Sequence, residues 1–189
     1  LDAVALPPAA AFVVTLVVLD AVRYVNHRLW HRVPLLWRLH RVHHSDVDYD
    51  LTVGLRFHPL EAILANLAVV AAVLALGAPV WAVVASDVAT ITLGHFAHGN
   101  VRLPPSVDRA IRTMLVTPAM HSTHHSVERD EATTNCGAVL SVWDRAFGSY
   151  LERPRAGDAI VFGLADERDP ARLGIVRLLG LPFAAPGRG

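Results

Sequence analysis

Histidines at helical spacing are the feature that most constrains this chain. Eight of its eleven histidines fall into three clusters whose members are three or four residues apart, a spacing that places their rings on one face of a helix. The clusters are His27 with His31, then His40, His43 and His44, then His121, His124 and His125. Imidazole is the commonest metal ligand in proteins, and a structural zinc ion takes only four ligands. So many clustered rings predict two metal ions.

Composition indicates a membrane protein of one domain. The chain has 189 residues, of which 53% are hydrophobic and 18% charged, whereas about a quarter of the residues of a soluble protein are charged. The formal net charge is zero, so nothing indicates a nucleic-acid partner. Cys136 is the only cysteine, which excludes an intrachain disulfide and a cysteine zinc site. The basic residues are all arginines, a bias typical of a GC-rich genome, and we expect a bacterial inner-membrane protein.

Three apolar segments predict membrane-spanning helices. They cover residues 7–25, 60–76 and 80–97, and each approaches the roughly 20 residues that a span requires. The first segment lacks the basic start and cleavage site of a signal peptide, so we expect it to be retained. Gly77 to Pro79 combines helix stop and start signals, which predicts a helical hairpin. The alternative, a buried hairpin of a soluble protein, fits the overall hydrophobicity less well.

The order of the histidine clusters resembles the histidine boxes of the fatty acid hydroxylase/sterol desaturase superfamily. Flanking motifs match as well, and the similarity runs from about Asp20 to Tyr150. These motifs are Leu36 to His40, Arg56 to Glu61, His98 to Asn100, Thr117 to His121, and Trp143 to Gly148. The resemblance implies an all-α, integral-membrane, non-haem di-iron oxygenase that acts on lipids. It also implies one domain over residues 1–189, with 151–189 as a tail and with N-terminal spans of the family missing.

The resemblance adds His98 to the expected metal ligands. The full expected set is His27, His31, His40, His43, His44, His95, His98, His121, His124 and His125. His95 lies one turn before His98 and is open to a second interpretation, a histidine that only ends its helix. His58 precedes a proline and shares no helix face with another histidine, so it is either a ligand or a residue that orients one. Asn100 is a further candidate for orienting a ligand.

Asp20 lies in the first apolar segment, where a carboxylate is costly if it faces lipid. Two interpretations are open. It hydrogen-bonds a ligand imidazole from the bundle interior, or it pairs with Arg23 at the membrane surface.

The activity implied by the resemblance is hydroxylation or desaturation of a lipid with two iron ions and O₂, with no catalytic residue beyond the metal ligands. The chain has no flavin, haem or iron–sulfur motif, so electrons come from a separate donor such as a cytochrome b5-like protein, a ferredoxin or a reductase. A zinc protease would need His-Glu-x-x-His, which is absent. The competing hypothesis is a non-catalytic or transport-type histidine-rich metal-binding membrane protein, for which Asp87 is the candidate acid within a span.

Arginines between the first span and the hairpin, and after the hairpin, place the histidine clusters on the cytoplasmic side. The uncharged turn at residues 77–79 is then outside. Residues 101–116 predict a helix on the bilayer surface. We expect Trp143 to Gly148 to pack as a lid over the metal-binding helices, and the apolar stretch from Leu173 to Phe183 to rest on the membrane.

Overall fold

The computed structural model describes residues 6–184, and within this range every regular element is a helix. The α-helices are α1 (Pro8–Arg32), α2 (Pro34–His40), α3 (Pro59–Leu76), α4 (Val80–His98), α5 (Pro105–Ile111), α6 (Pro118–His124), α7 (Val142–Ala146) and α8 (Ile175–Gly180). The 3-10 helices are η1 (His43–Ser45), η2 (Leu51–Leu55), η3 (Gly157–Ala159), η4 (Pro170–Arg172) and η5 (Leu181–Phe183). The predicted all-α class is confirmed. The two ends of the expected domain, residues 1–5 and 185–189, lie outside the described residues.

Among the described residues, α1, α3 and α4 are long and apolar enough to cross a membrane. Most of α3 is exposed in the isolated chain, as expected for a helix whose surroundings are lipid. The three predicted spans are therefore confirmed, and the protein is a multi-pass membrane protein. Because α1 continues to Arg32, the first histidine pair lies on the same helix as the first span, as expected.

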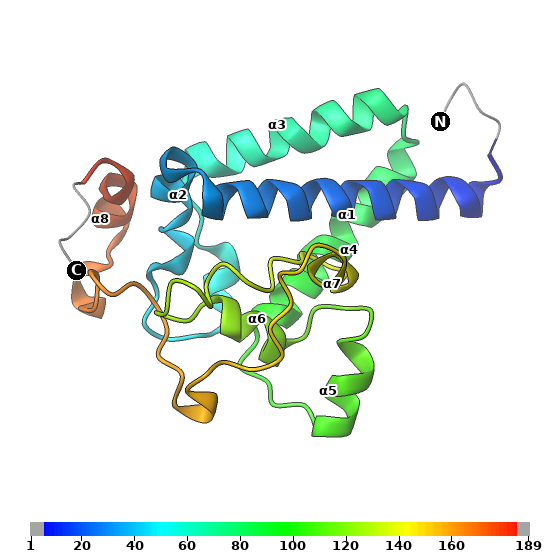
Figure 1. The fold of residues 1–189 in the computed structure, drawn as a ribbon. Helices are drawn as coiled ribbons and strands as arrows, with labels where there is room; N and C mark the ends of the chain where they lie inside the picture. Colours follow the sequence, from blue (N-terminus) through cyan, green and yellow to red (C-terminus); the bar gives the residue numbers. More distant parts are fainter. Residues whose placement is uncertain (1–5, 185–189) are drawn as a thin grey trace.

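Both arms of the predicted hairpin pack against α1 and diverge from each other (Figure 1). Gly77 ends α3 in the left-handed conformation, with φ of 57°, and its N–H donates to Leu74 O. Pro79 then precedes α4 and the chain turns away. Helices α3 and α4 thus form an open hairpin, and both of them contact α1.

The second histidine cluster departs from its predicted geometry. The spacing of His40, His43 and His44 predicted one helix through all three, but α2 ends at His40 and the chain resumes as the 3-10 helix η1 at His43. Pro34 begins α2 at its first position, as expected.

Asp20 anchors the C-terminal half of the chain to α1. Its carboxylate accepts hydrogen bonds from Val139 N (3.0 Å), Leu140 N (3.0 Å) and Trp143 Nε1 (2.8 Å). Three N–H donors of a distant segment therefore converge on Asp20, which neither interpretation anticipated. In the described part of the chain, Arg23 pairs with Asp87 of α4 instead.

The expected surface helix is shorter than predicted, whereas the expected lid packs against α1. Residues 101–116 contain only the seven-residue α5. The motif from Trp143 to Gly148 overlaps α7 and lies against α1 through the Trp143 bond and through stacking of Phe147 on Tyr24 (ring centroids 5.6 Å apart). It therefore closes on α1, the helix that carries the first histidine pair.

Candidate metal centre

The structure brings nine of the ten predicted ligands into two buried groups. Within each group, one nitrogen from every ring lies within 4.8 Å of the others. The first group, called the five-histidine group, is His27, His31, His40, His44 and His124. The second, called the four-histidine group, is His43, His98, His121 and His125. The two groups adjoin, since the rings of His44 and His125 stack with centroids 4.5 Å apart.

Each of the two histidine triads in the sequence divides its side chains between the groups. At the end of α6, His121 and the C-cap residue His125 stand about one turn apart and enter the four-histidine group, while His124 belongs to the five-histidine group. In the second cluster, His40 and His44 enter the five-histidine group, while His43 enters the four-histidine group. Two adjoining sites are thus built by the same short segments.

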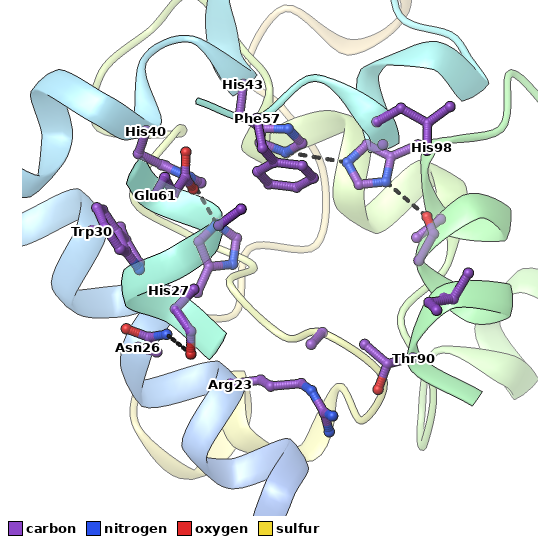
Figure 2. A pocket seen from close by; sticks show the side chains of 18 of the residues that line it. Arg23, Asn26, His27, Trp30, His40, His43, Phe57, Glu61, Thr90 and His98 are labelled. Carbon is purple, nitrogen blue, oxygen red and sulfur yellow. Dashed lines mark hydrogen bonds and ion pairs between the residues drawn. The ribbon is translucent and has the colours of Figure 1, made fainter. Parts of the chain in front are cut away.

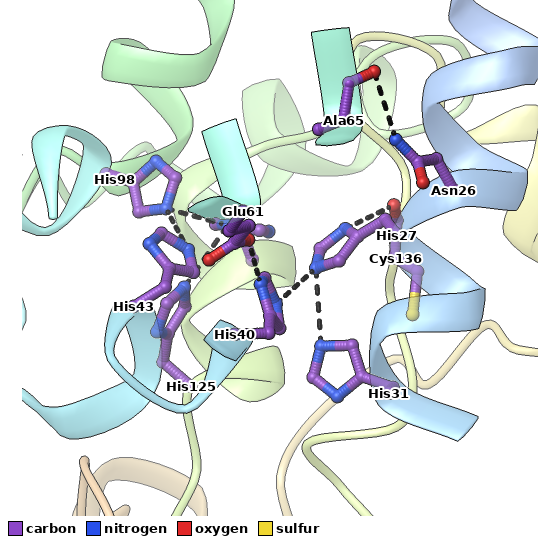
Figure 3. Close-up of polar contacts among 11 residues, drawn as sticks. Asn26, His27, His31, His40, His43, Glu61, Ala65, His98, His125 and Cys136 are labelled. Atoms are coloured by element: carbon purple, nitrogen blue, oxygen red, sulfur yellow. Dashed lines mark hydrogen bonds and ion pairs between the residues drawn. The ribbon is translucent and has the colours of Figure 1, made fainter. Parts of the chain in front are cut away.

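Acceptors behind the rings determine which nitrogen carries the proton. Nδ1 of His27 donates to Cys136 O (2.9 Å), and Nδ1 of His124 donates to Thr134 O (2.7 Å). Nδ1 of His40 faces the carboxylate of Glu61 at 2.5 Å (Figure 3). A carbonyl or carboxylate oxygen only accepts, so each neutral ring keeps its proton on Nδ1 and presents the Nε2 lone pair.

This tautomer makes the centre of the five-histidine group a site for a cation. Nε2 of His27 lies 3.2 Å from Nε2 of His40 (Figure 3), and neither nitrogen has a proton to share when both rings are neutral. In the described structure, Nε2 of His44 and Nε2 of His124 are also buried without a hydrogen-bond partner. Unpaired buried acceptors are costly, and a metal ion among them would satisfy all of them at once.

The four-histidine group converges in the same way. Nε2 of His98 lies 3.0 Å from Nε2 of His121 and 3.3 Å from Nε2 of His43, and Nε2 of His125 lies 3.3 Å from that of His121. His98 donates from Nδ1 to Gly94 O (2.7 Å), so its Nε2 is an acceptor. The donor set is all nitrogen, which suits zinc, copper, iron or nickel and not magnesium or calcium.

Five of the rings outside the spans are held neutral. Burial lowers the pKa of His43, His44, His121 and His125 well below its ordinary value, and the neighbouring imidazoles lower it further. Burial lowers the pKa of His124 to about 3, although its bond to Thr134 O acts in the opposite direction. At neutral pH these side chains are therefore in the form that binds metal.

The sequence matches the family model described as fatty acid hydroxylase over residues 12–149. That range contains all nine histidines of the two groups and most of the chain. The chain belongs to the fatty acid hydroxylase family. The resemblance drawn from the histidine boxes is thereby confirmed.

Curated relatives in this family are lipid-modifying enzymes. The chain is 29% identical to ornithine lipid hydroxylase OlsE of Rhizobium tropici, in a match that covers 96% of this chain and 53% of OlsE. It is 29% identical to human alkylglycerol monooxygenase, over 75% of this chain and 30% of that enzyme. The chain thus spans about half the length of OlsE and about a third of the human protein. No solved structure gives a significant match.

Three residues that the sequence offered as metal ligands or as residues that orient them lie outside both histidine groups. His95 is half-buried and donates from Nδ1 to Ile91 O (2.7 Å), one turn back along α4. His58 caps α3, where its Nδ1 accepts from Leu60 N (3.2 Å) and its Nε2 donates to Leu179 O (3.3 Å). Asn100 is exposed just beyond the end of α4. The structure therefore brings none of the three to the two metal groups.

Glu61 is a site residue that the sequence reasoning missed. It lies in the first turn of α3, is only 3% exposed, and its carboxylate contacts Nδ1 of His40. The helix dipole alone favours an acid in the first turn of a helix, so this position by itself does not identify a site residue. The better signal was a carboxylate at the start of an apolar span, where a buried partner is needed. A carboxylate behind a ligand imidazole orients the ring and raises its basicity.

A cavity of about 530 Å³ lies between the two histidine groups and the three spans. Its walls include His27 and His40 from one group and His98 from the other, so it reaches both (Figure 2). The remaining lining is mainly apolar, and its largest share comes from α3 and α4, including Ala65 and Val69. Arg23 lies one turn from His27 on α1 and borders the end of the cavity away from the four-histidine group. The arrangement joins a metal site to a space for an apolar molecule.

Proposed function

We propose that this protein is a membrane-bound, non-haem di-iron oxygenase that hydroxylates or desaturates a lipid with O₂. The observation that carries the proposal is the pair of all-histidine groups on the wall of an apolar cavity between three spans. Membership of the fatty acid hydroxylase family and relatives named for lipid hydroxylation support it.

The nine histidines would hold two metal ions, one in each group. Iron is the metal we propose, because oxidation of an unactivated C–H bond needs a redox metal, and affinity alone does not select it. Bound there, two irons supply the electron transfer and O₂ activation that no side chain can supply. The protein fixes the rings through Glu61 and through the carbonyls of Cys136, Thr134 and Gly94.

The cavity would bind the lipid. Its apolar walls allow a hydrocarbon chain to enter without crossing water, and burial contributes about 0.8 kcal/mol per CH₂. OlsE and alkylglycerol monooxygenase are named for lipids with polar head groups. We propose a membrane lipid of that general kind, presented with one carbon at the histidine wall and its chain between α3 and α4.

The electrons would come from a separate protein on the cytoplasmic side. We infer this orientation from arginines on the histidine side of the spans and from the uncharged turn at Gly77 to Pro79. Single cysteines test it: one replacing Ala78 should react with an impermeant reagent added outside, and one replacing Asp48 only after the membrane is opened. The reverse pattern would contradict the orientation.

Asp87, the residue that favoured a transporter, has a different explanation in the structure. It forms an ion pair with Arg23, whose other terminal nitrogen donates to Ser86 (3.1 Å). A paired carboxylate that links α4 to α1 supports helix packing more than passage of a free ion. This observation favours the oxygenase over the transporter.

The test is isotopic. Membranes that contain the protein are incubated under ¹⁸O₂ with a reductant and a reductase system, and extracted lipids are analysed by mass spectrometry. The expected result is a lipid that has gained one ¹⁸O atom or one new double bond. Membranes with a variant lacking His124 should leave the same lipid unchanged. If an iron-loaded, reduced protein yields neither product, the metal-binding or transport function becomes the better account.

A further inference from the structure

The segment from Gly174 to Phe183, which forms α8 and η5, lies beyond the part of the chain that matches the family model. It carries two apolar faces. One contains Leu178 and Leu181, which pack into a buried cluster with Val42, Leu164 and Trp37. The other is fully apolar and exposed, and it contains Ile175 (75% exposed), Val176 (82%), Leu179 (45%) and Phe183 (68%). We call this second set the outer face.

The outer face is continuous with the surface of a span. His58, the residue that caps the N-terminus of α3, donates to Leu179 O (3.3 Å), and its ring lies edge-on to Phe183 (centroids 6.1 Å apart). Leu60 and Ile63, in the first turns of α3, are themselves exposed and apolar. Because α3 starts where the chain enters the bilayer, the segment tied to its cap lies at the depth of the membrane surface.

From these contacts we propose that the outer face is a membrane-surface anchor that inserts into the head-group region beside the start of α3. The neighbouring charges fit this position: Arg177 pairs with Glu167 at the edge of the segment, and Arg38 of α2 donates to Pro182 O (2.6 Å). Figure 1 shows α8 next to α2 and the start of α3, away from the loops that include η3. An exposed apolar face flanked by arginines is typical of a helix that lies on a bilayer.

The inner face of the segment also connects it to the metal-binding region. Its inner face packs against Trp37, and the Trp37 ring lies 5.2 Å from the ring of His31 and 5.4 Å from that of His44. A segment held at the membrane surface therefore supports α2 from behind. The proposal concerns membrane contact and does not depend on the oxygenase activity.

The experiment places an environment-sensitive fluorophore on a cysteine that replaces Val176 in the full chain, reconstituted in phosphatidylcholine nanodiscs. Cys136 is buried, so the unsubstituted protein serves as the labelling control. The matched position is Asp158, which is exposed in η3. We expect blue-shifted emission at position 176 and several-fold stronger quenching by lipids with a nitroxide near the head group than at position 158.

Equal, water-like quenching at the two positions would overturn the proposal. So would emission at position 176 that shifts with protein concentration and ignores the lipid quencher, because the outer face would then bind a second copy of the chain. A second variant, Ile175→Asn with Val176→Asn, leaves the inner face intact and should abolish protection of residues 174–183 from protease in nanodiscs. Unchanged protection in that variant would also contradict a membrane contact.

Discussion

The two histidine groups differ in how the protein supports them. In the five-histidine group, three rings are held from behind, by Cys136 O, Thr134 O and the Glu61 carboxylate. In the four-histidine group, His98 is held by Gly94 O, while Nδ1 of His43 and Nδ1 of His121 are buried without a partner in the described residues. The first group is therefore oriented by the fold, and the second depends more on the metal itself. Protein-oriented ligands should bind metal more tightly.

The largest effect is expected from His121→Ala. It reduces the four-histidine group to three rings in the site that has the weaker support, so most metal should leave that group while the other keeps its ion. Inductively coupled plasma mass spectrometry of the purified protein should fall from two irons to about one per chain. Loss of both ions would show that the two groups do not bind metal independently, and it would contradict the difference in support between them.

His124→Ala should have a smaller effect on metal content. Four rings remain in the five-histidine group, and two of them, His27 and His40, keep the acceptors behind them. We expect weakened binding, seen as faster loss of one iron to a chelator, with activity abolished. Chelator resistance equal to that of the unsubstituted protein would contradict the assignment of His124 as a ligand.

Glu61→Gln tests the support itself. The amide is close in size to the carboxylate, but it removes the negative charge behind His40. Losing such a partner typically costs about 10–100-fold in metal affinity. A titration of the apoprotein with Fe²⁺ should show this loss for one ion only. If both ions, or neither, lose affinity, Glu61 does not act through His40.

The sequence predicted which histidines gather at the candidate metal site more completely than it predicted how they are arranged there. Spacing along helices identified eight of the nine rings because rings three or four residues apart share a face, and the family resemblance supplied the ninth, His98. The division of each triad between two groups was not predictable, since it depends on which histidines of other segments the fold brings to each side of the triad. The contacts of Asp20 were not anticipated for a similar reason, because its partners at residues 139–143 are brought close only by the fold.

The smallest effect is expected from His95→Ala, which separates the two interpretations of that residue. His95 lies on the cavity wall but outside both groups, and its Nδ1 is engaged with Ile91 O. We expect the iron content to stay within about 10% of the unsubstituted protein, because no ring of either group contacts it through a ligand nitrogen. Loss of an ion would restore His95 as a ligand and add a fifth ring to the smaller group.

The most direct test of the central claim is the identity and number of the metal ions. Protein expressed with ⁵⁷Fe and purified anaerobically should contain two irons per chain, and its Mössbauer spectrum should show two high-spin ferrous sites with nitrogen ligands, one for each histidine group. Oxidation by O₂ should change both signals together. A single iron, or stable occupancy by zinc with O₂-insensitive spectra, would contradict a di-iron oxygenase.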